Sequence, residues 1–324
     1  MRLDRALLTV LCVLMLAALP CFAQEVPPLP PGEVVDEAAP DVEPTLLRFN
    51  YEKGETLTYE TTVDGVGSVH VMGEAQAIDM SGKMLVTMLV EDVTEEGNYV
   101  IATDVDIAEL SVKMNGSPVP PPNQALAMRT TMSPRGELLN VEMTETANQP
   151  NAESPWNSQM TKMLTGGFDL NRMILGQKIA AFPEAAVKPG DEWKGNVEEV
   201  ELQGQTAPVS ITTKYDGNID LEGRTCARLD SEACMQSDAL GELAAMLSME
   251  GQTTIQTRSW FDIEAGRMFA TMEKTQVNMQ VQLPAAMTGA AGPAGVFLEM
   301  FVYTQTKLLP ASEDGTAVDG ADEG

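Results

Sequence analysis

The chain has 324 residues, of which 44% are hydrophobic, and its 48 Asp and Glu against 20 Lys and Arg give a net charge of −28 at pH 7. A surface this acidic repels nucleic acid and anionic lipid headgroups, which excludes electrostatic binding to either. The length is enough for one large domain or for two smaller ones, each with its own core.

The first residues have the pattern of an export signal. Arg2 and Arg5 precede an apolar run, Ala6–Pro20, which ends at the small-x-small site Cys21-Phe22-Ala23. This pattern predicts a signal peptide over residues 1–23 and a mature protein in the periplasm or outside the cell. The apolar run is too short to cross a membrane, so we expect no transmembrane helix in the mature chain. The cysteine lacks the small residue before it that lipid attachment needs, which argues against a lipid anchor on Cys21.

Two acidic segments flank the part of the chain that we expect to fold. Residues 24–45 combine prolines with acidic side chains, and residues 310–324 carry acids with almost no large apolar residue. Neither segment can bury enough apolar surface to offset the entropy of ordering the chain. We therefore predict a disordered linker at 24–45 and a disordered tail at 310–324.

Residues 46–149 have the pattern of antiparallel strands. Apolar side chains alternate with polar ones, which is typical of strands that bury one face. Short Gly-containing turns separate the alternating stretches, as expected for hairpins. The predicted strands lie within Phe49–Val63, Met80–Val90, Tyr99–Ile107, Ala125–Met132 and Glu137–Thr144.

In residues 150–182 the spacing of apolar residues changes from alternation to the spacing of a helix. Met160, Met163 and Met173 have apolar neighbours at helical spacing, and Asp169 can cap a second short helix. We predict a short helical connector at this point.

Residues 183–309 repeat the turn chemistry of the first part in the same order. Each of three turns has a glycine where the chain needs a positive φ, and each has a counterpart 126 to 136 residues later. The pairs are Gly54 and Gly190, Gly97 and Gly223, and Gly136 and Gly266, with Trp193 following the second member of the first pair as a core anchor.

These features together predict a mainly β protein. Its two related antiparallel β-sheet halves, 46–149 and 183–309, form either one curved sheet or a sandwich, and the helical connector joins them. The sequence resembles a family of exported bacterial proteins of uncharacterised function. Its members share a strand-turn like Tyr51–Leu57, a central Phe-Pro to Trp motif (here Phe182–Trp193) and a late Phe-Asp to Gly-Arg hairpin (here Phe261–Arg267). This resemblance implies export and a β-rich fold, and it implies no activity.

Residues that could carry catalysis or bind a metal are scarce. His70 is the only histidine and lies on an alternating strand, so we expect a structural or surface role for it. No zinc set, phosphate-binding loop, dinucleotide motif or nucleophile elbow is present. The stretch Asp216–Asp220 begins like a calcium loop but lacks the glycine and the closing glutamate. We therefore predict no catalytic residue, no cofactor and no metal, although a pair of carboxylates acting as acid and base stays open.

Two cysteines remain after removal of the signal peptide, Cys226 and Cys234. A strand of this length holds its ends roughly 26 Å apart, whereas a disulfide needs Cα atoms within about 7 Å. We expect two unpaired thiols on one strand.

Methionine is unusually frequent, with 21 in the chain. Thioether side chains adapt to irregular core gaps, and they also suit a pocket that accepts an apolar ligand. The candidate pocket residues are Met80, Met84, Met88, Met160, Met163 and Met173. The leading hypothesis is an exported, non-enzymatic envelope protein whose curved sheet binds a hydrophobic ligand or a protein partner. The alternatives are a purely structural or interaction module of the envelope and a hydrolase with a weak sequence signature.

Overall fold

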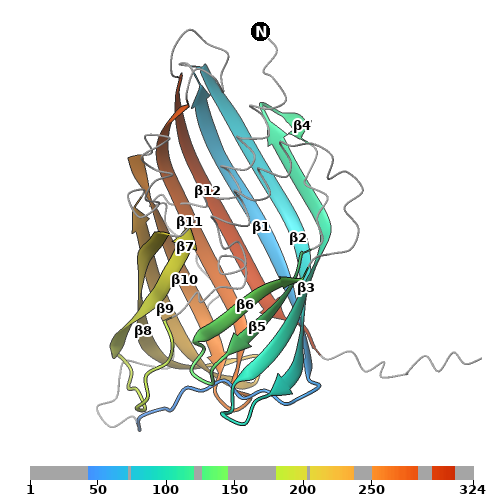
Figure 1. Ribbon diagram of the computed structural model, residues 1–324, viewed down its shortest axis with the longest axis vertical. Helices are drawn as coiled ribbons and strands as arrows, with labels where there is room; N and C mark the ends of the chain where they lie inside the picture. Colours follow the sequence, from blue (N-terminus) through green and yellow to red (C-terminus); the bar gives the residue numbers. More distant parts are fainter. Residues whose placement is uncertain are drawn as a thin grey trace, which may run out of the picture.

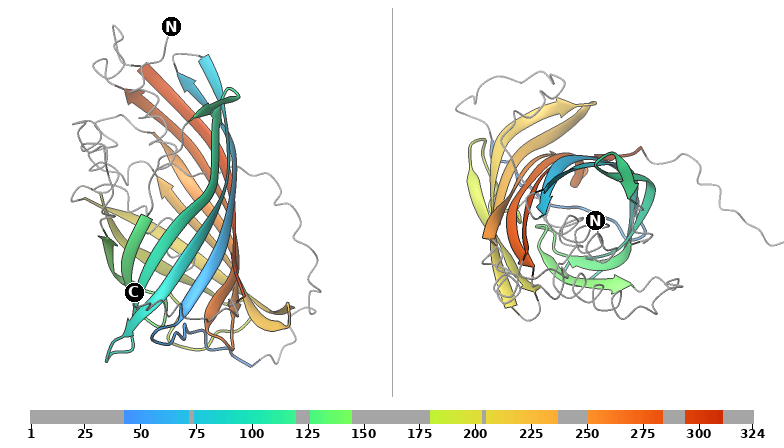
Figure 2. Two further views of the ribbon diagram at one scale, coloured as in Figure 1. Left: turned by 90° about the vertical axis from the view of Figure 1, so that its right-hand side faces the viewer. Right: turned by 90° about the horizontal axis from the view of Figure 1, so that it is seen from above.

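The computed structural model describes residues 43–71, 74–119, 126–144, 180–202, 205–236, 250–283 and 294–310. Within these ranges the chain forms one open antiparallel sheet, which curves around a central space (Figure 1, and the view from above in Figure 2). The strands are β1 Thr56–Val71, β2 Glu74–Val93, β3 Tyr99–Met114, β4 Ser117–Val119, β5 Leu126–Met132, β6 Leu138–Thr144, β7 Glu192–Leu202, β8 Gln205–Leu221, β9 Arg224–Gln236, β10 Glu250–Asp262, β11 Arg267–Leu283 and β12 Ala294–Leu308.

The strand order joins the two parts of the chain into a single layer. It runs β6-β5-β3-β2-β1-β12-β11-β10-β9-β8-β7, with the short β4 paired to β3. The first strand therefore pairs with the last one, with Tyr59 opposite Leu308. The predicted β class and the curved-sheet alternative are confirmed, and the described strands do not form a sandwich of two sheets. Residues 150–179 of the predicted helical connector lie outside the described residues.

Tight turns occupy one end of the sheet, which we call the turn end. Gly54, Gly97, Gly136, Gly190, Gly223 and Gly266 lie there, each with a φ between 63° and 92°. At the opposite end, which we call the far end, β3 and β4 are joined by the turn Asn115-Gly116, where both residues have positive φ. Asn-Gly is the pair that a two-residue hairpin of this twist favours.

Two of the turns dock on the sheet with the same bonds. The Gly54 amide donates to the Val90 carbonyl, and the Val90 amide donates back to Glu55. Gly190 donates in the same way to Tyr215, whose amide donates back to Asp191. In each turn, the acidic side chain after the glycine also accepts a bond from the amide three residues earlier.

Residues Thr45–Tyr51, which we call the N-terminal strap, cross the turn end. Thr45 exchanges two backbone hydrogen bonds with Val187, which precedes β7. Further along the strap, the Phe49 amide donates to Pro134 in the β5–β6 turn, at 2.8 Å. The strap thus touches both edges of the open sheet. The strap therefore bridges the segments next to the two edge strands, β6 and β7, which do not pair with each other.

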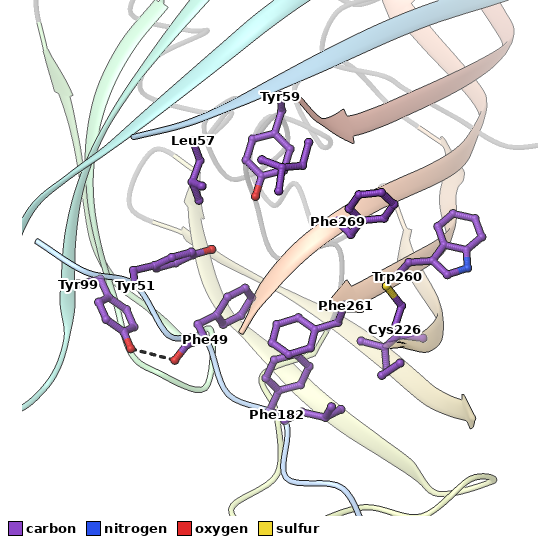
Figure 3. Packing of buried hydrophobic residues seen from close by; sticks show 14 of the residues in the cluster. Phe49, Tyr51, Leu57, Tyr59, Tyr99, Phe182, Cys226, Trp260, Phe261 and Phe269 are labelled. Atoms are coloured by element: carbon purple, nitrogen blue, oxygen red, sulfur yellow. Dashed lines mark hydrogen bonds between the residues drawn. The ribbon is translucent and has the colours of Figure 1, made fainter. Parts of the chain in front are cut away.

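An aromatic cluster fills the space beneath the strap (Figure 3). Phe49 stacks on Phe182 with ring centroids 5.4 Å apart and meets Phe261 edge-on at 5.3 Å. Tyr51 packs against Tyr99, whose hydroxyl donates to the Phe49 carbonyl at 2.8 Å. These rings anchor the turn end, because buried aromatic side chains contribute large apolar areas and their polar groups find partners.

Candidate functional site

The concave face of the sheet is identified by the core cluster. The cluster joins Val86 and Ile101 of β2 and β3 to Tyr215, Leu229 and Phe261 of β8, β9 and β10. In the sheet, β2 and β3 are separated from β8, β9 and β10 by β1, β12 and β11, so side chains of the two groups can meet only on the concave side. Alternation along each strand then assigns every second residue to this inner face.

One half of the inner face, on β1, β2 and β3, is mostly apolar, and several of its side chains are only partly buried. The residues that remain partly accessible between the aromatic cluster and the far end form what we call the inner strip. It consists of Val63, Met80, Met84, Ile107, Leu110 and Val112. Two of the predicted pocket methionines, Met80 and Met84, thus belong to the strip. Met88 lies on the same face, and both Met84 and Met88 pack against the core cluster. Met160, Met163 and Met173 lie outside the described residues.

Glycines let neighbouring strands approach closely beside the inner strip. Gly65 and Gly67 of β1 and Gly82 of β2 share the inner face. A Cβ on Gly67 would lie 2.5 Å from the Glu299 carbonyl oxygen of β12, so no larger residue fits without moving the backbone. Glycines inside strands mark such close approaches and sharp bends, which give the sheet its curvature.

The other half of the inner face, on β12 to β8, carries hydroxyl groups. Several of these pair with each other across strands: Thr213 with Ser231 at 2.8 Å, and Thr61 of β1 with Thr306 of β12 at 3.1 Å. The inner-face hydroxyl residues on these strands are Thr304, Thr306, Thr271, Thr275, Thr253, Thr257, Ser259, Ser231 and Thr213. The concave side is therefore amphipathic: one half of the inner face is mostly apolar, and the other half is rich in hydroxyl groups.

Glu273 lies at the centre of the hydroxyl-bearing half. Its register partners are Thr304 on β12 and Thr257 on β10, and Val63 of the inner strip faces Thr304 one strand further on. The Thr275 hydroxyl donates to a Glu273 carboxylate oxygen at 2.8 Å. Among the described residues of β1 to β3 and β9 to β12, Glu273 is the one charged side chain on the inner face away from its rims.

Sequence reasoning missed Glu273, although a signal for it was present. Glu273 has the same parity in its strand as Phe269, Val277 and Met279, which are buried. When a carboxylate occupies one of the alternate strand positions that otherwise hold apolar side chains, it lies on the buried face.

The sequence-predicted anchors occupy the turn end and not the inner strip. The six glycines form its turns, and Trp193 is half-buried, with its indole N–H donating to the Ala180 carbonyl at 3.3 Å. His70 lies on the outer face, edge-on to Phe297 with centroids 5.8 Å apart.

The predicted pair of unpaired cysteines is confirmed. Cys226 and Cys234 are both free and lie on the single strand β9, the first buried and the second exposed. Desolvation of the buried thiol, followed by the nearby charge of Asp262, raises the pKa of Cys226 to about 11. A thiol with this pKa is almost entirely protonated at neutral pH and unreactive.

The outer face has paired charges and one shallow pocket. Asp216, the first residue of the incomplete calcium loop, is paired with Arg228 and Lys214. A pocket of about 250 Å³ is lined mainly by outward-facing residues such as Asp64, Asp79 and Lys113, and also by Met80 of the inner strip. The described residues contain no group of three or more His, Cys, Asp or Glu side chains placed to hold a metal ion. They also contain no helix long and apolar enough to cross a membrane.

No protein-family model matches the chain, and no curated protein matches it. Several solved structures are similar to it, of which two are described here. One, described as lipid-protein interactions in lipovitellin, is 9% identical over 83% of this chain and 27% of that chain, with a TM-score of 0.41. The other, a DUF1329 family protein from Desulfovibrio piger, is 7% identical over 80% of this chain and 87% of that chain, with a TM-score of 0.15. The chain thus spans about a quarter of the lipovitellin chain, and neither likeness carries an argument here.

Proposed function

We propose that this is an exported, non-enzymatic protein that binds a hydrophobic ligand on the concave face of its curved sheet. The observation that carries the proposal is the inner strip. Six apolar side chains on three adjacent strands stay partly accessible on the concave side, beside an aromatic cluster that closes the turn end. Apolar surface that is concave and accessible is the common setting of small-molecule sites.

The composition of the strip supports an adaptable site. Met80 and Met84 are flexible, and Gly82 between them presents no side chain. Methionine-rich surfaces can repack around ligands of different shape, which rigid side chains do less well. An extended acyl or alkyl chain matches a surface that is long in the strand direction and apolar across three strands.

Binding of a neutral fluorescent probe, N-phenyl-1-naphthylamine, tests the proposal. Val63→Trp places a large ring in the strip and should weaken probe binding about 10-fold, the effect of about 1.4 kcal/mol. Val66→Trp is the matched control, because Val66 is 55% exposed on the outer face of the same strand. Failure of the wild-type protein to bind the probe, or equal binding by both variants, would contradict the proposal.

Native mass spectrometry of protein purified from its own host identifies the ligand. A co-purifying lipid supports a hydrophobic-ligand protein, whereas a co-purifying protein supports the interaction module. The same spectrum reports the mass of the chain, which tests export, since removal of residues 1–23 leaves a protein that begins at Gln24.

The internal repeat is also part of this proposal. The matching bonds of the Gly54 and Gly190 turns support two related halves, as does the same direction of the β1-β2-β3 and β7-β8-β9 meanders. On this view the binding face was built by joining two copies of one meander, with β12 added between them.

A further inference from the structure

We propose that the pocket on the outer face of the sheet is a second binding site and that its ligand is a neutral saccharide. The pocket lies on the opposite side of the sheet from the inner strip, so this inference goes beyond the proposed function and does not depend on it. It is carried by the pocket itself, by the unpartnered polar side chains that line it, and by the mixture of hydrogen-bond donors and acceptors among them.

Outward-facing residues of four neighbouring strands form the pocket. The strands β3, β2, β1 and β12 lie side by side in this order (Figure 1). The register arranges the lining side chains in two rows that cross these strands. One row is Ser111, Ser81, Asp64 and Tyr303, and the other is Lys113, Asp79 and Val66. Pockets for drug-sized ligands have volumes of about 300–1,000 Å³, so a pocket of about 250 Å³ suits one small ring at a time.

The protein itself does not use the polar side chains of these two rows. All of them are exposed except Tyr303, which is partly buried. Within the part of the chain that the structure describes, their side chains make no hydrogen bond and no ion pair. Lys113 is opposite Asp79 in the register, and even these two side chains are not paired. Their polar groups can therefore exchange bound water for the hydroxyl groups of a ligand.

The donors and acceptors in the pocket are mixed in a way that fits a ligand with several hydroxyl groups. Asp64 and Asp79 are diagonal neighbours on β1 and β2, and carboxylates accept hydrogen bonds. The Lys113 ammonium donates, and the serine and tyrosine hydroxyls do both. A sugar hydroxyl can donate to a carboxylate and also accept from an ammonium, and hydrogen bonds to charged groups are the stronger ones.

The pocket also offers apolar surface beside these polar groups. Val66 is 55% exposed, and Tyr303 is opposite Asp64 on β12. A sugar ring has C–H groups on its faces, and packing them against a valine side chain and an aromatic ring removes apolar surface from water. One ring can thus combine apolar contact with several hydrogen bonds.

The charges in the pocket argue against an ionised ligand. An anion would approach two carboxylates on a protein whose net charge is −28. A cation would be attracted to the carboxylates, but it would also be repelled by the Lys113 ammonium and would offer it no acceptor. A neutral ligand with several hydroxyls uses both kinds of charged group without repulsion.

Saturation-transfer difference NMR on the purified protein tests the proposal, with maltotriose, cellotriose and chitotriose as neutral probes and spermidine as a cationic one. We expect a transfer signal from at least one trisaccharide and none from spermidine. Asp64→Asn and Asp79→Asn should each weaken the affinity for that trisaccharide about 10-fold, because each removes a charged acceptor. Asp104→Asn is the matched control, since Asp104 is exposed on the outer face of β3 but does not line the pocket, and its affinity should be unchanged.

The outcomes separate this site from the hydrophobic one. Val63→Trp changes the inner strip, so it should leave saccharide binding unchanged, and the two pocket variants should bind N-phenyl-1-naphthylamine as the wild-type protein does. No signal from any of the three trisaccharides, equal trisaccharide affinity in the wild-type protein and both pocket variants, or binding of spermidine in their place overturns the saccharide site and leaves the hydrophobic site standing. Absence of N-phenyl-1-naphthylamine binding overturns only the proposed function.

Discussion

Replacing the turn glycines by alanine tests how the N-terminal strap is held. Gly190 and Gly266 both have positive φ, +92° and +63°. They differ in what a new Cβ would meet. At Gly190 no atom lies within 4 Å, whereas at Gly266 the Cβ would lie 2.8 Å from the Asn50 nitrogen and 3.0 Å from the Arg48 carbonyl oxygen. The neighbours of Gly266 are the Asn50 Cβ, at 2.6 Å, and backbone atoms of the strap, none of which can rotate away as the end of a flexible side chain can.

The two substitutions should therefore have different effects on the free energy of unfolding. Alanine in the left-handed region costs about 1–2 kcal/mol, and the reduced freedom of the unfolded chain returns about 0.4–1 kcal/mol. Gly190→Ala should thus destabilise by about 1 kcal/mol. Gly266→Ala adds the displacement of packed backbone, about 1–3 kcal/mol, for a total of about 2–4 kcal/mol.

Urea unfolding followed by tryptophan fluorescence gives both values, with Gly97→Ala as a second case in open space. Hydrogen exchange locates the effect. The Asn50 amide donates to the Gly266 carbonyl at 2.9 Å, so its exchange should accelerate in Gly266→Ala and stay unchanged in Gly190→Ala. Equal destabilisation by the two substitutions, or unchanged exchange at Asn50 in Gly266→Ala, would refute the reasoning.

Three further outcomes follow from the packing. In the folded protein without its signal peptide, a thiol reagent at neutral pH should modify exposed Cys234 and reach buried Cys226 only after unfolding; two rapidly reacting thiols would contradict the burial. Phe49→Ala should lower the free energy of unfolding by about 3–5 kcal/mol, whereas Leu139→Ala, at a site 54% exposed, should change it by less than about 0.5 kcal/mol in urea titrations. Burial raises the pKa of Tyr59 above its usual value of about 10. The buried, protonated hydroxyl therefore contributes its full stability below pH of about 10, and this contribution is lost as the pH rises further. Tyr59→Phe should reduce the decrease of the urea midpoint at alkaline pH, and an unchanged decrease would contradict the assignment.

The sequence by itself determined the local features of this protein. Alternation with period two located β1, β2 and β3, because a strand with one buried face shows that pattern in its own residues. The turn glycines were equally readable, since positive φ is a property of a single residue and its neighbours. The same alternation placed Met80, Met84 and Met88 on one face, which the register with β1 shows to be the inner one.

Only the tertiary structure decided how these elements form a site. Pairing of β1 with β12 joins residues far apart in the chain, such as Tyr59 and Leu308, which are about 250 positions apart (308 − 59 = 249), and no local signal specifies such a partner. The sequence also did not reveal the strap, because Arg48 and Phe49 donate hydrogen bonds to backbone carbonyls of loops far along the chain. The place of Glu273 on the inner face likewise follows only from the register of β11 with its neighbours and from the curvature of the sheet. Alternation says that two faces exist, and the closed packing of distant strands decides which of them is hidden from water.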